Sequence, residues 1–104
     1  MRMEKIGSFG VDSGTVMIID PCYIKDIDNP KFKDCNLDKL YETLADQDTA
    51  TLGKSFAVAS RTGYGDGVYP VYALYKDDRV MGIFVDFNGI IANPDDGSWL
   101  AWPN

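Results

Sequence analysis

Residues 68–87 have the sequence VYPVYALYKDDRVMGIFVDF, and this stretch decides the fold. Its two ends, 68–75 and 80–87, are rich in β-branched and aromatic residues, which favours two strands. The polar residues 76–79 predict a turn between them, so the strands form a hairpin. Both faces of strand 68–75 are apolar, whereas a single antiparallel sheet usually leaves one face polar. We therefore expect a second sheet or another subunit to cover the second face.

Apolar segments elsewhere predict further strands at residues 4–10, 15–20 and 55–60. One helix is expected at 37–46, because Leu37, Leu40, Tyr41 and Leu44 recur at helical spacing after Asn36, a favourable N-cap. Turn residues at 93–97 precede a hydrophobic tail at 99–102. The patterns together predict a mostly β, α+β fold, namely an antiparallel, β-sandwich-like sheet with one short helix.

Composition and length limit the classes of protein to which the chain can belong. With 104 residues, of which 45% are hydrophobic, residues 1–104 are expected to form a single domain. No apolar run approaches the ~18–20 residues of a membrane span, and the N-terminus leaves no room for a signal peptide, so we expect a cytoplasmic protein. The net charge of −6 argues against a DNA or RNA polymer as partner.

The absence of histidine removes the commonest general base and the commonest metal ligand. Cys22 and Cys35 are expected to be free thiols in a reducing compartment. We therefore expect no enzyme, no cofactor and no metal site. The alternative is a hydrolytic or Mg²⁺ site built from aspartates, although these lie at turns and strand ends, where Asp also caps backbone N–H groups; they are Asp12, Asp20, Asp66 and Asp86.

The segment from Ser60 to Pro70, SRTGYGDGVYP, is the most informative for function. Its three alternating glycines permit positive φ and close approach of a ligand to the backbone. Arg61 supplies a fork-shaped cation and Thr62 a hydroxyl. The alternative is a structural loop in which Arg61 pairs with Asp66. We predict ligand binding by seven residues, with the tyrosines as stacking faces: Ser60, Arg61, Thr62, Tyr64, Asp66, Tyr69 and Tyr23.

Tyr23 belongs to a second motif, Asp20-Pro21-Cys22-Tyr23, which directly follows a predicted buried strand. The tyrosine is expected at the rim of the sheet, where it either contacts the ligand or covers the edge of the core.

The chain resembles a family of small phage and bacterial proteins through four segments: Val-Asp-Ser-Gly at 11–14, Asp-Pro-Cys-Tyr at 20–23, Gly63 to Tyr72, and the closing strand 80–87. These proteins look like viral sponges that sequester the cyclic-nucleotide messengers of bacterial antiviral (CBASS) defence. The resemblance implies a bacteriophage immune-evasion protein in the host cytoplasm. It would hold a cyclic dinucleotide such as 3′,3′-cGAMP intact, as a homo-oligomer (dimer or tetramer). The alternatives are a protein-binding inhibitor of a host factor and a metal-dependent hydrolase that uses the aspartates.

Overall fold

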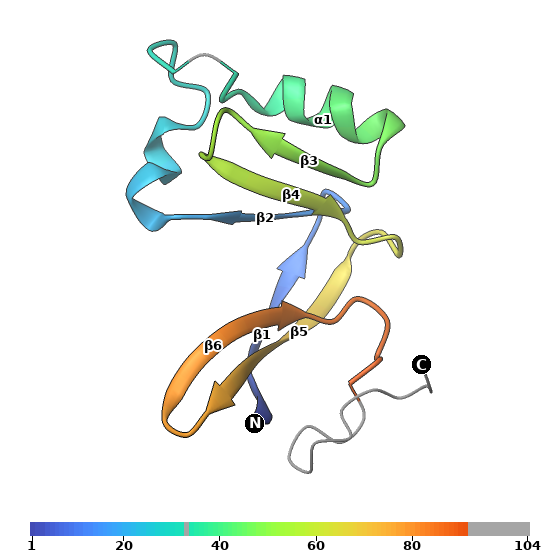
Figure 1. The fold of residues 1–104 in the computed structure, drawn as a ribbon. Coiled ribbons are helices and arrows are strands. Elements are labelled where there is room, and N and C mark those ends of the chain that lie inside the picture. The colour runs from blue at the N-terminus through green and yellow to red at the C-terminus, as the bar shows by residue number, and fades with distance from the viewer. Residues whose placement is uncertain (33, 92–104) are drawn as a thin grey trace. The chain divides into compact units, whose positions relative to one another are not determined.

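The computed structural model describes residues 1–32 and 34–91, and the chain divides into two compact units. Unit 1 combines residues 1–12 with the chain from residue 66 onward, and unit 2 comprises residues 13–65. Each unit contains a three-stranded antiparallel sheet, as Figure 1 shows.

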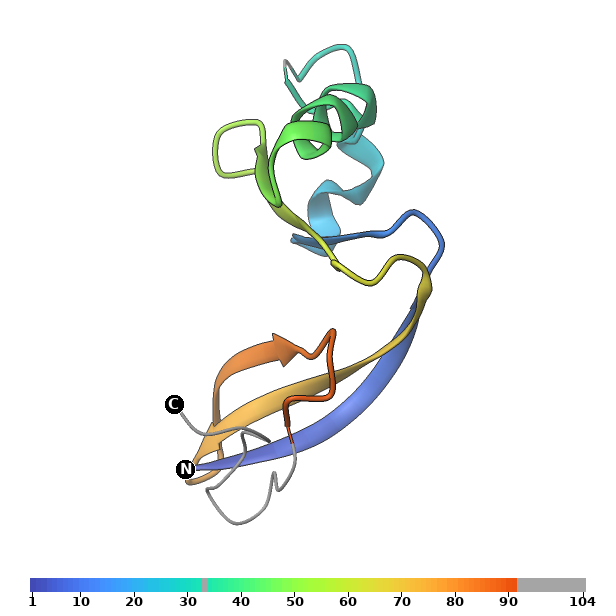
Figure 2. The ribbon, with the colours of Figure 1, turned by 90° about the vertical axis from the view of Figure 1, so that its right-hand side faces the viewer.

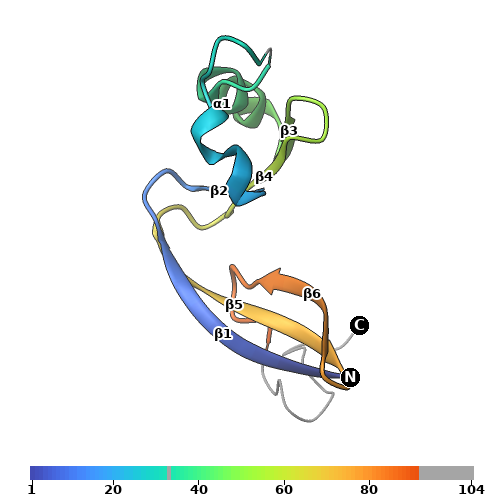
Figure 3. The same ribbon diagram turned by 90° about the vertical axis from the view of Figure 1, so that its left-hand side faces the viewer.

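The sheet of unit 1 has the strand order β1-β5-β6. Strand β1 (Arg2–Val11) pairs with β5 (Gly67–Lys76) with one register shift between Lys5 and Gly7, and the two strands curve together in Figure 2. Strand β6 (Arg79–Val85) returns alongside β5 after a two-residue turn at Asp77 and Asp78. The predicted hairpin of β5 and β6 is therefore confirmed. Figure 3 shows it from the side opposite to that of Figure 2.

Burial in unit 1 differs strongly between its strands. Tyr69 and Ala73 of β5 are buried, together with Met3 and Val11 of β1. In contrast, β6 lies at an edge of the described sheet and exposes large apolar side chains: Val80, Met81, Ile83 and Phe84. The exposed apolar side chains of β6 agree with the expectation that this sheet needs a further cover. What covers it stays a prediction.

The sheet of unit 2 has the order β2-β4-β3, formed by β2 (Thr15–Ile19), β4 (Ala57–Arg61) and β3 (Thr49–Leu52). The helix α1 (Leu37–Asp46) packs on this sheet, and a short 3₁₀ helix, η1 (Pro21–Asp26), follows β2 (Figure 1). The core between helix and sheet consists of Cys35, Leu40, Leu44, Leu52, Ala57 and Ala59.

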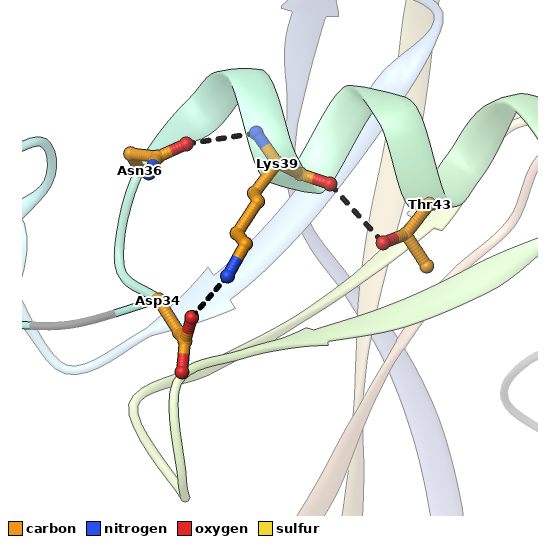
Figure 4. Close-up of polar contacts among 4 residues, drawn as sticks. All are labelled: Asp34, Asn36, Lys39 and Thr43. Carbon is orange, nitrogen blue, oxygen red and sulfur yellow. Dashed lines mark hydrogen bonds and ion pairs between the residues drawn. The ribbon is translucent and has the colours of Figure 1, made fainter.

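Local hydrogen bonds explain where α1 begins (Figure 4). The Asn36 side chain accepts a 2.8 Å hydrogen bond from the backbone N–H of Lys39, as expected of an N-cap. The Lys39 ammonium forms an ion pair with Asp34, and Thr43 donates from Oγ1 to the Lys39 carbonyl. The predicted helix at 37–46 is confirmed.

Tyr41 shares the helical spacing of Leu37, Leu40 and Leu44, but it is 44% exposed and does not belong to the buried stripe of the helix. The stripe is centred on Leu40 and Leu44, which are buried one turn apart, with Leu37 half-buried beside them. Tyr41 follows Leu40 by about 100° around the helix axis, since an α-helix has about 3.6 residues per turn. It therefore lies at the border of the buried face.

The mostly β, α+β fold class, with antiparallel sheets and one short α-helix, is confirmed. Strand β3 and helix η1 were not predicted. Strand β4 starts at Ala57 rather than at Ser55, because Ser55 has a φ of 64° within a turn. The sandwich-like arrangement and the single domain stay predictions. The predicted turn 93–97 and tail 99–102 lie outside the described residues.

Two further sequence expectations concern cysteines and membranes. Cys22 is exposed, Cys35 is buried, and both are free thiols. Within the described part of the chain, no helix has the length and apolar character needed to cross a membrane.

Candidate functional site

The side chain of Thr62 organises the loop that follows β4. This residue is 3% exposed, and its Oγ1 donates a 2.8 Å hydrogen bond to the carbonyl of Gly65. The same oxygen accepts a 3.1 Å hydrogen bond from the backbone N–H of Tyr64. Gly63 and Gly65 have φ values of 77° and 74°, which L side chains rarely adopt. The glycine pattern and the threonine thus fix one tight loop.

A second glycine turn lies against this loop, at Ser13 and Gly14. The backbone N–H of Thr62 donates a 3.0 Å hydrogen bond to the carbonyl of Gly14. A Cβ atom built on Gly14, whose φ is 67°, would lie 3.8 Å from the Cα of Gly65. The register of the sheet explains this contact, because Thr15 of β2 pairs with Arg61 of β4. Two backbone turns therefore meet at one end of the sheet of unit 2.

Arg61 is the last residue of β4 and connects the sheet to the end of α1. Its backbone N–H donates a 2.9 Å hydrogen bond to the carbonyl of Asp48. Its guanidinium Nη1 donates a 3.1 Å hydrogen bond to the carbonyl of Leu44, in the last turn of the helix. Helix ends leave such carbonyls without a partner, and a cation there also stabilises the helix dipole. Arg61 therefore caps the C-terminus of α1.

The guanidinium of Arg61 keeps further donors available. It has five N–H donors, and among residues 1–32 and 34–91 only the Leu44 carbonyl accepts from it. With Nη1 attached to Leu44, the side of the guanidinium that carries Nε and Nη2 remains able to bind a ligand.

These elements surround an open cavity of about 690 Å³, which we call the Arg61 cavity. All of its lining residues belong to unit 2: Ser13 and Gly14 from the turn before β2, Thr15 at the start of β2, Tyr41, Leu44 and Ala45 from α1, Asp48, and Arg61, Thr62, Gly63 and Gly65. The cavity thus combines one cation, one carboxylate, one aromatic ring and the backbone of two glycine turns.

The structure places two of the seven predicted residues, Arg61 and Thr62, in the lining of this cavity. Ser60 and Tyr64 are neighbours of these two in sequence but do not line it. The Ser60 hydroxyl donates to the carbonyl of Arg61 at 2.8 Å, and Tyr64 is 60% exposed.

Tyr23 lies at the opposite end of the same sheet. It belongs to η1, which follows Ile19, and Ile19 pairs with Ala57 at the start of β4. Its ring stacks on Phe56 with centroids 5.2 Å apart, and Phe56 packs against the core of unit 2. The sequence left open whether Tyr23 contacts a ligand or covers the edge of the core, and the contact with Phe56 favours the second interpretation. Tyr23 is not a neighbour of the Arg61 cavity.

Asp66 and Tyr69 belong to unit 1, whereas the Arg61 cavity lies in unit 2. Asp66 is exposed directly before β5. Tyr69 is only 7% exposed and packs edge-on against Phe87, with ring centroids 5.4 Å apart. Both faces of its ring are therefore largely enclosed, and it offers little surface on which a base could stack.

Two of the four candidate catalytic aspartates cap backbone N–H groups. Asp20 accepts a 2.9 Å hydrogen bond from the N–H of Cys22 at the start of η1. Asp86 is 1% exposed and accepts from Asn88, Ile90 and Ile91 at 3.1, 3.0 and 2.9 Å. Burial raises the pKa of Asp86, but these backbone donors outweigh it, so that the pKa is lowered overall.

A group of three or more His, Cys, Asp or Glu residues placed to hold a metal ion is not found within the described ranges. The carboxylate of Asp86 points instead into its own backbone turn, where its hydrogen bonds already use both oxygens.

Sequence reasoning missed Tyr41 and Asp48. Tyr41 counts in the sequence only as one of the residues at helical spacing, and Asp48 follows the helix in a short connection with no recognisable motif. The Ser13-Gly14 turn carried a signal, because it forms part of the Val11 to Gly14 motif that supported the resemblance.

The chain belongs to the family described as protein of unknown function DUF4241, which matches residues 1–85. The match covers all of unit 2, the three strands of unit 1 and every residue that lines the Arg61 cavity. No curated protein and no solved structure matches the sequence significantly.

Proposed function

We propose that this protein binds a nucleotide in the Arg61 cavity and does not convert it. The observation that carries the proposal is the position of the Arg61 guanidinium, which the Leu44 carbonyl fixes while other N–H donors stay available. The cavity volume of about 690 Å³ falls within the ~300–1,000 Å³ typical of small-molecule sites. The two glycine turns let a ligand approach the backbone closely.

The scarcity of groups that could act as general acids or bases supports binding without turnover. The sequence contains no histidine. Asp20 and Asp86, which could have acted as acids or bases, are engaged by backbone N–H groups. The groups that line the Arg61 cavity include one carboxylate, Asp48, whereas acid–base hydrolysis commonly uses a pair.

The resemblance to viral sponges specifies the ligand that we propose. A cyclic dinucleotide such as 3′,3′-cGAMP would be sequestered intact in the cytoplasm of an infected bacterium, and CBASS defence would lose its messenger. The chain has a net charge of −6, so the binding of such an anionic ligand depends on local groups such as Arg61 and not on the net charge.

The exposed apolar residues of β6 support a homo-oligomer, either a dimer or a tetramer. Val80, Met81 and Ile83 are each more than half exposed at a sheet edge, and such edges readily pair with another chain. Sedimentation at micromolar concentration should show no dominant 11.5 kDa monomer. The same β6 residues favour the second candidate function, a protein-binding inhibitor of a host factor.

The deciding experiment measures what the protein takes up and releases. The purified protein is incubated with a panel of cyclic dinucleotides, separated from free ligand and denatured, and the released compounds are identified by mass spectrometry. Intact release supports the sponge. Release of linear or otherwise altered products would show a hydrolase and refute binding without turnover. No uptake of any nucleotide would reject nucleotide binding and leave the protein-binding inhibitor.

Variants of Arg61 test the location of the site by calorimetry. Arg61→Ala should weaken binding about ten- to a hundredfold, since a charge-assisted hydrogen bond contributes ~1.5–3 kcal/mol. Arg61→Lys should keep a cation at the end of α1 but lose the paired donors of the guanidinium. Arg79→Ala is the matched control, because it removes the same charge from unit 1. Equal affinity in all four proteins would place the site elsewhere.

A further inference from the structure

The charges around the Arg61 cavity are unfavourable for a phosphate group. Among residues 1–32 and 34–91, Arg61 is the only cation that lines the cavity, and part of its guanidinium is already bonded to Leu44. Asp48 contributes a negative charge, and Leu44 and Ala45 belong to the last turn of α1. The C-terminal end of a helix carries partial negative charge, and the last turn of α1 contains no basic residue. An uncharged part of a ligand fits this environment better than a phosphate.

The same groups require a ligand with two different hydrogen-bonding edges. The side of the Arg61 guanidinium that carries Nε and Nη2 presents parallel N–H donors and needs two neighbouring acceptors. Asp48 also lines the cavity, and a carboxylate at this position can accept hydrogen bonds from one or two donors of a ligand. The Tyr41 ring, 44% exposed, offers a face on which a flat ring could stack.

Guanine has both edges on one planar ring. Its O6 and N7 atoms are adjacent acceptors, and arginine binds them with two hydrogen bonds in many nucleic-acid complexes. Its N1–H and N2–H₂ groups are adjacent donors, and a carboxylate can accept a hydrogen bond from each of them. Adenine has an amino group in place of O6 and a lone pair at N1. It would therefore present a donor to Arg61 and an acceptor to Asp48.

We propose that the Arg61 cavity recognises a guanine base, with Arg61 bound to O6 and N7 and Asp48 bound to N1–H and N2–H₂. This inference rests on the proposed nucleotide binding and specifies which part of the nucleotide enters the cavity. The phosphates of the ligand would then lie outside the cavity.

Paired ligands and one matched variant test the assignment. Calorimetry compares cyclic di-GMP with cyclic di-AMP, and GMP with IMP, which lacks only the 2-amino group. Cyclic di-GMP should bind about tenfold or more tightly than cyclic di-AMP, because a good two-bond contact discriminates bases by ~1–3 kcal/mol. GMP should bind more tightly than IMP. Asp48→Asn should reduce both preferences, whereas Asp46→Asn, which removes the same charge from a residue outside the lining, should leave both unchanged.

The outcomes separate this inference from the proposed function. Equal binding of guanine and adenine nucleotides would overturn guanine recognition and leave nucleotide binding intact. If Asp48→Asn strengthens the binding of all nucleotides equally, Asp48 acts only through its charge, and guanine recognition is likewise overturned. Absence of binding by every nucleotide would overturn the proposed function itself. Melting curves check that both variants are folded; Asp48→Asn leaves in place the backbone carbonyl of residue 48, which accepts from the Arg61 N–H.

Discussion

Replacing Gly53 by alanine should destabilise the core of unit 2 through steric conflict as well as backbone strain. Gly53 has a φ of 61°, and a Cβ atom there would lie 2.8 Å from the Cys35 sulfur and 3.2 Å from the Cβ of Phe56. Cys35 is buried within the core and has little room to move. Positive φ costs an L residue about 1–2 kcal/mol, and overpacking typically adds ~1–3 kcal/mol. Gly53→Ala should therefore lower the free energy of unfolding by about 2–5 kcal/mol.

Gly63→Ala is the matched control for this prediction. Gly63 has a similar φ of 77°, but apart from its own residue and its two neighbours in sequence, no heavy atom of the described residues lies within 4 Å of the position that a Cβ would occupy. It should carry the backbone penalty alone, about 1–2 kcal/mol. The difference between the two variants measures the steric contribution at Gly53.

The double variant Gly53→Ala/Cys35→Ala identifies the clashing atom. Removal of the sulfur leaves space for the new methyl group, so the double variant should be more stable than the sum of the single effects predicts, by ~1 kcal/mol or more. Urea unfolding followed by circular dichroism under reducing conditions gives the four free energies of the cycle, those of the wild type, Gly53→Ala, Cys35→Ala and the double variant. A Gly53→Ala protein no less stable than Gly63→Ala, or strict additivity in the double variant, would refute the reasoning.

Three further predictions concern caps and thiols. Asn36→Ala should reduce the free energy of unfolding by ~1 kcal/mol, whereas Asn36→Asp keeps the side-chain acceptor and should be nearly neutral in thermal melts. The pKa of Asp86 is lowered in the folded state, so its contribution to stability is present above the ordinary carboxyl pKa of ~3.9 and is lost as the pH falls through the folded pKa. Asp86→Asn should therefore flatten the decline of stability with acid; an unchanged acid profile would contradict this. In the native protein a thiol reagent should modify Cys22 and spare Cys35, because burial hides Cys35 and raises the pKa of its thiol; equal native reaction rates would be the contrary result.

Local patterns predicted those elements whose signals lie within one short segment. The bounds of α1 followed from Asn36 and the leucine stripe, and the β5–β6 hairpin followed from two apolar runs around a polar turn. Strand β3 has the sequence Thr-Ala-Thr-Leu, which lacks bulky residues apart from Leu52. It is a strand because it pairs with β4, where Thr51 lies opposite Val58. That pairing is a tertiary contact that no local pattern contains.

The site was predictable to the same limited extent. The glycine spacing and the adjacent cation indicated Arg61 and Thr62, and both line the cavity. Tyr69 is predicted as a stacking face, but both faces of its strand are apolar, and its enclosure depends on tertiary contacts such as the one with Phe87. Asp48 could not be found, because its role depends on the end of α1 meeting the end of β4.

The position of Arg61 has a consequence for any experiment on this site. The hydrogen bond from its guanidinium to Leu44 means that the same side chain stabilises α1 and faces the ligand. Arg61→Ala should therefore lower stability as well as affinity, and weaker binding alone would not distinguish a lost contact from a loosened helix end. Arg61→Lys separates the two effects, because a lysine can still interact with the helix carbonyls but cannot offer parallel donors. A lysine variant with wild-type stability and arginine-like affinity would show that the charge at the helix end, rather than the shape of the guanidinium, governs binding.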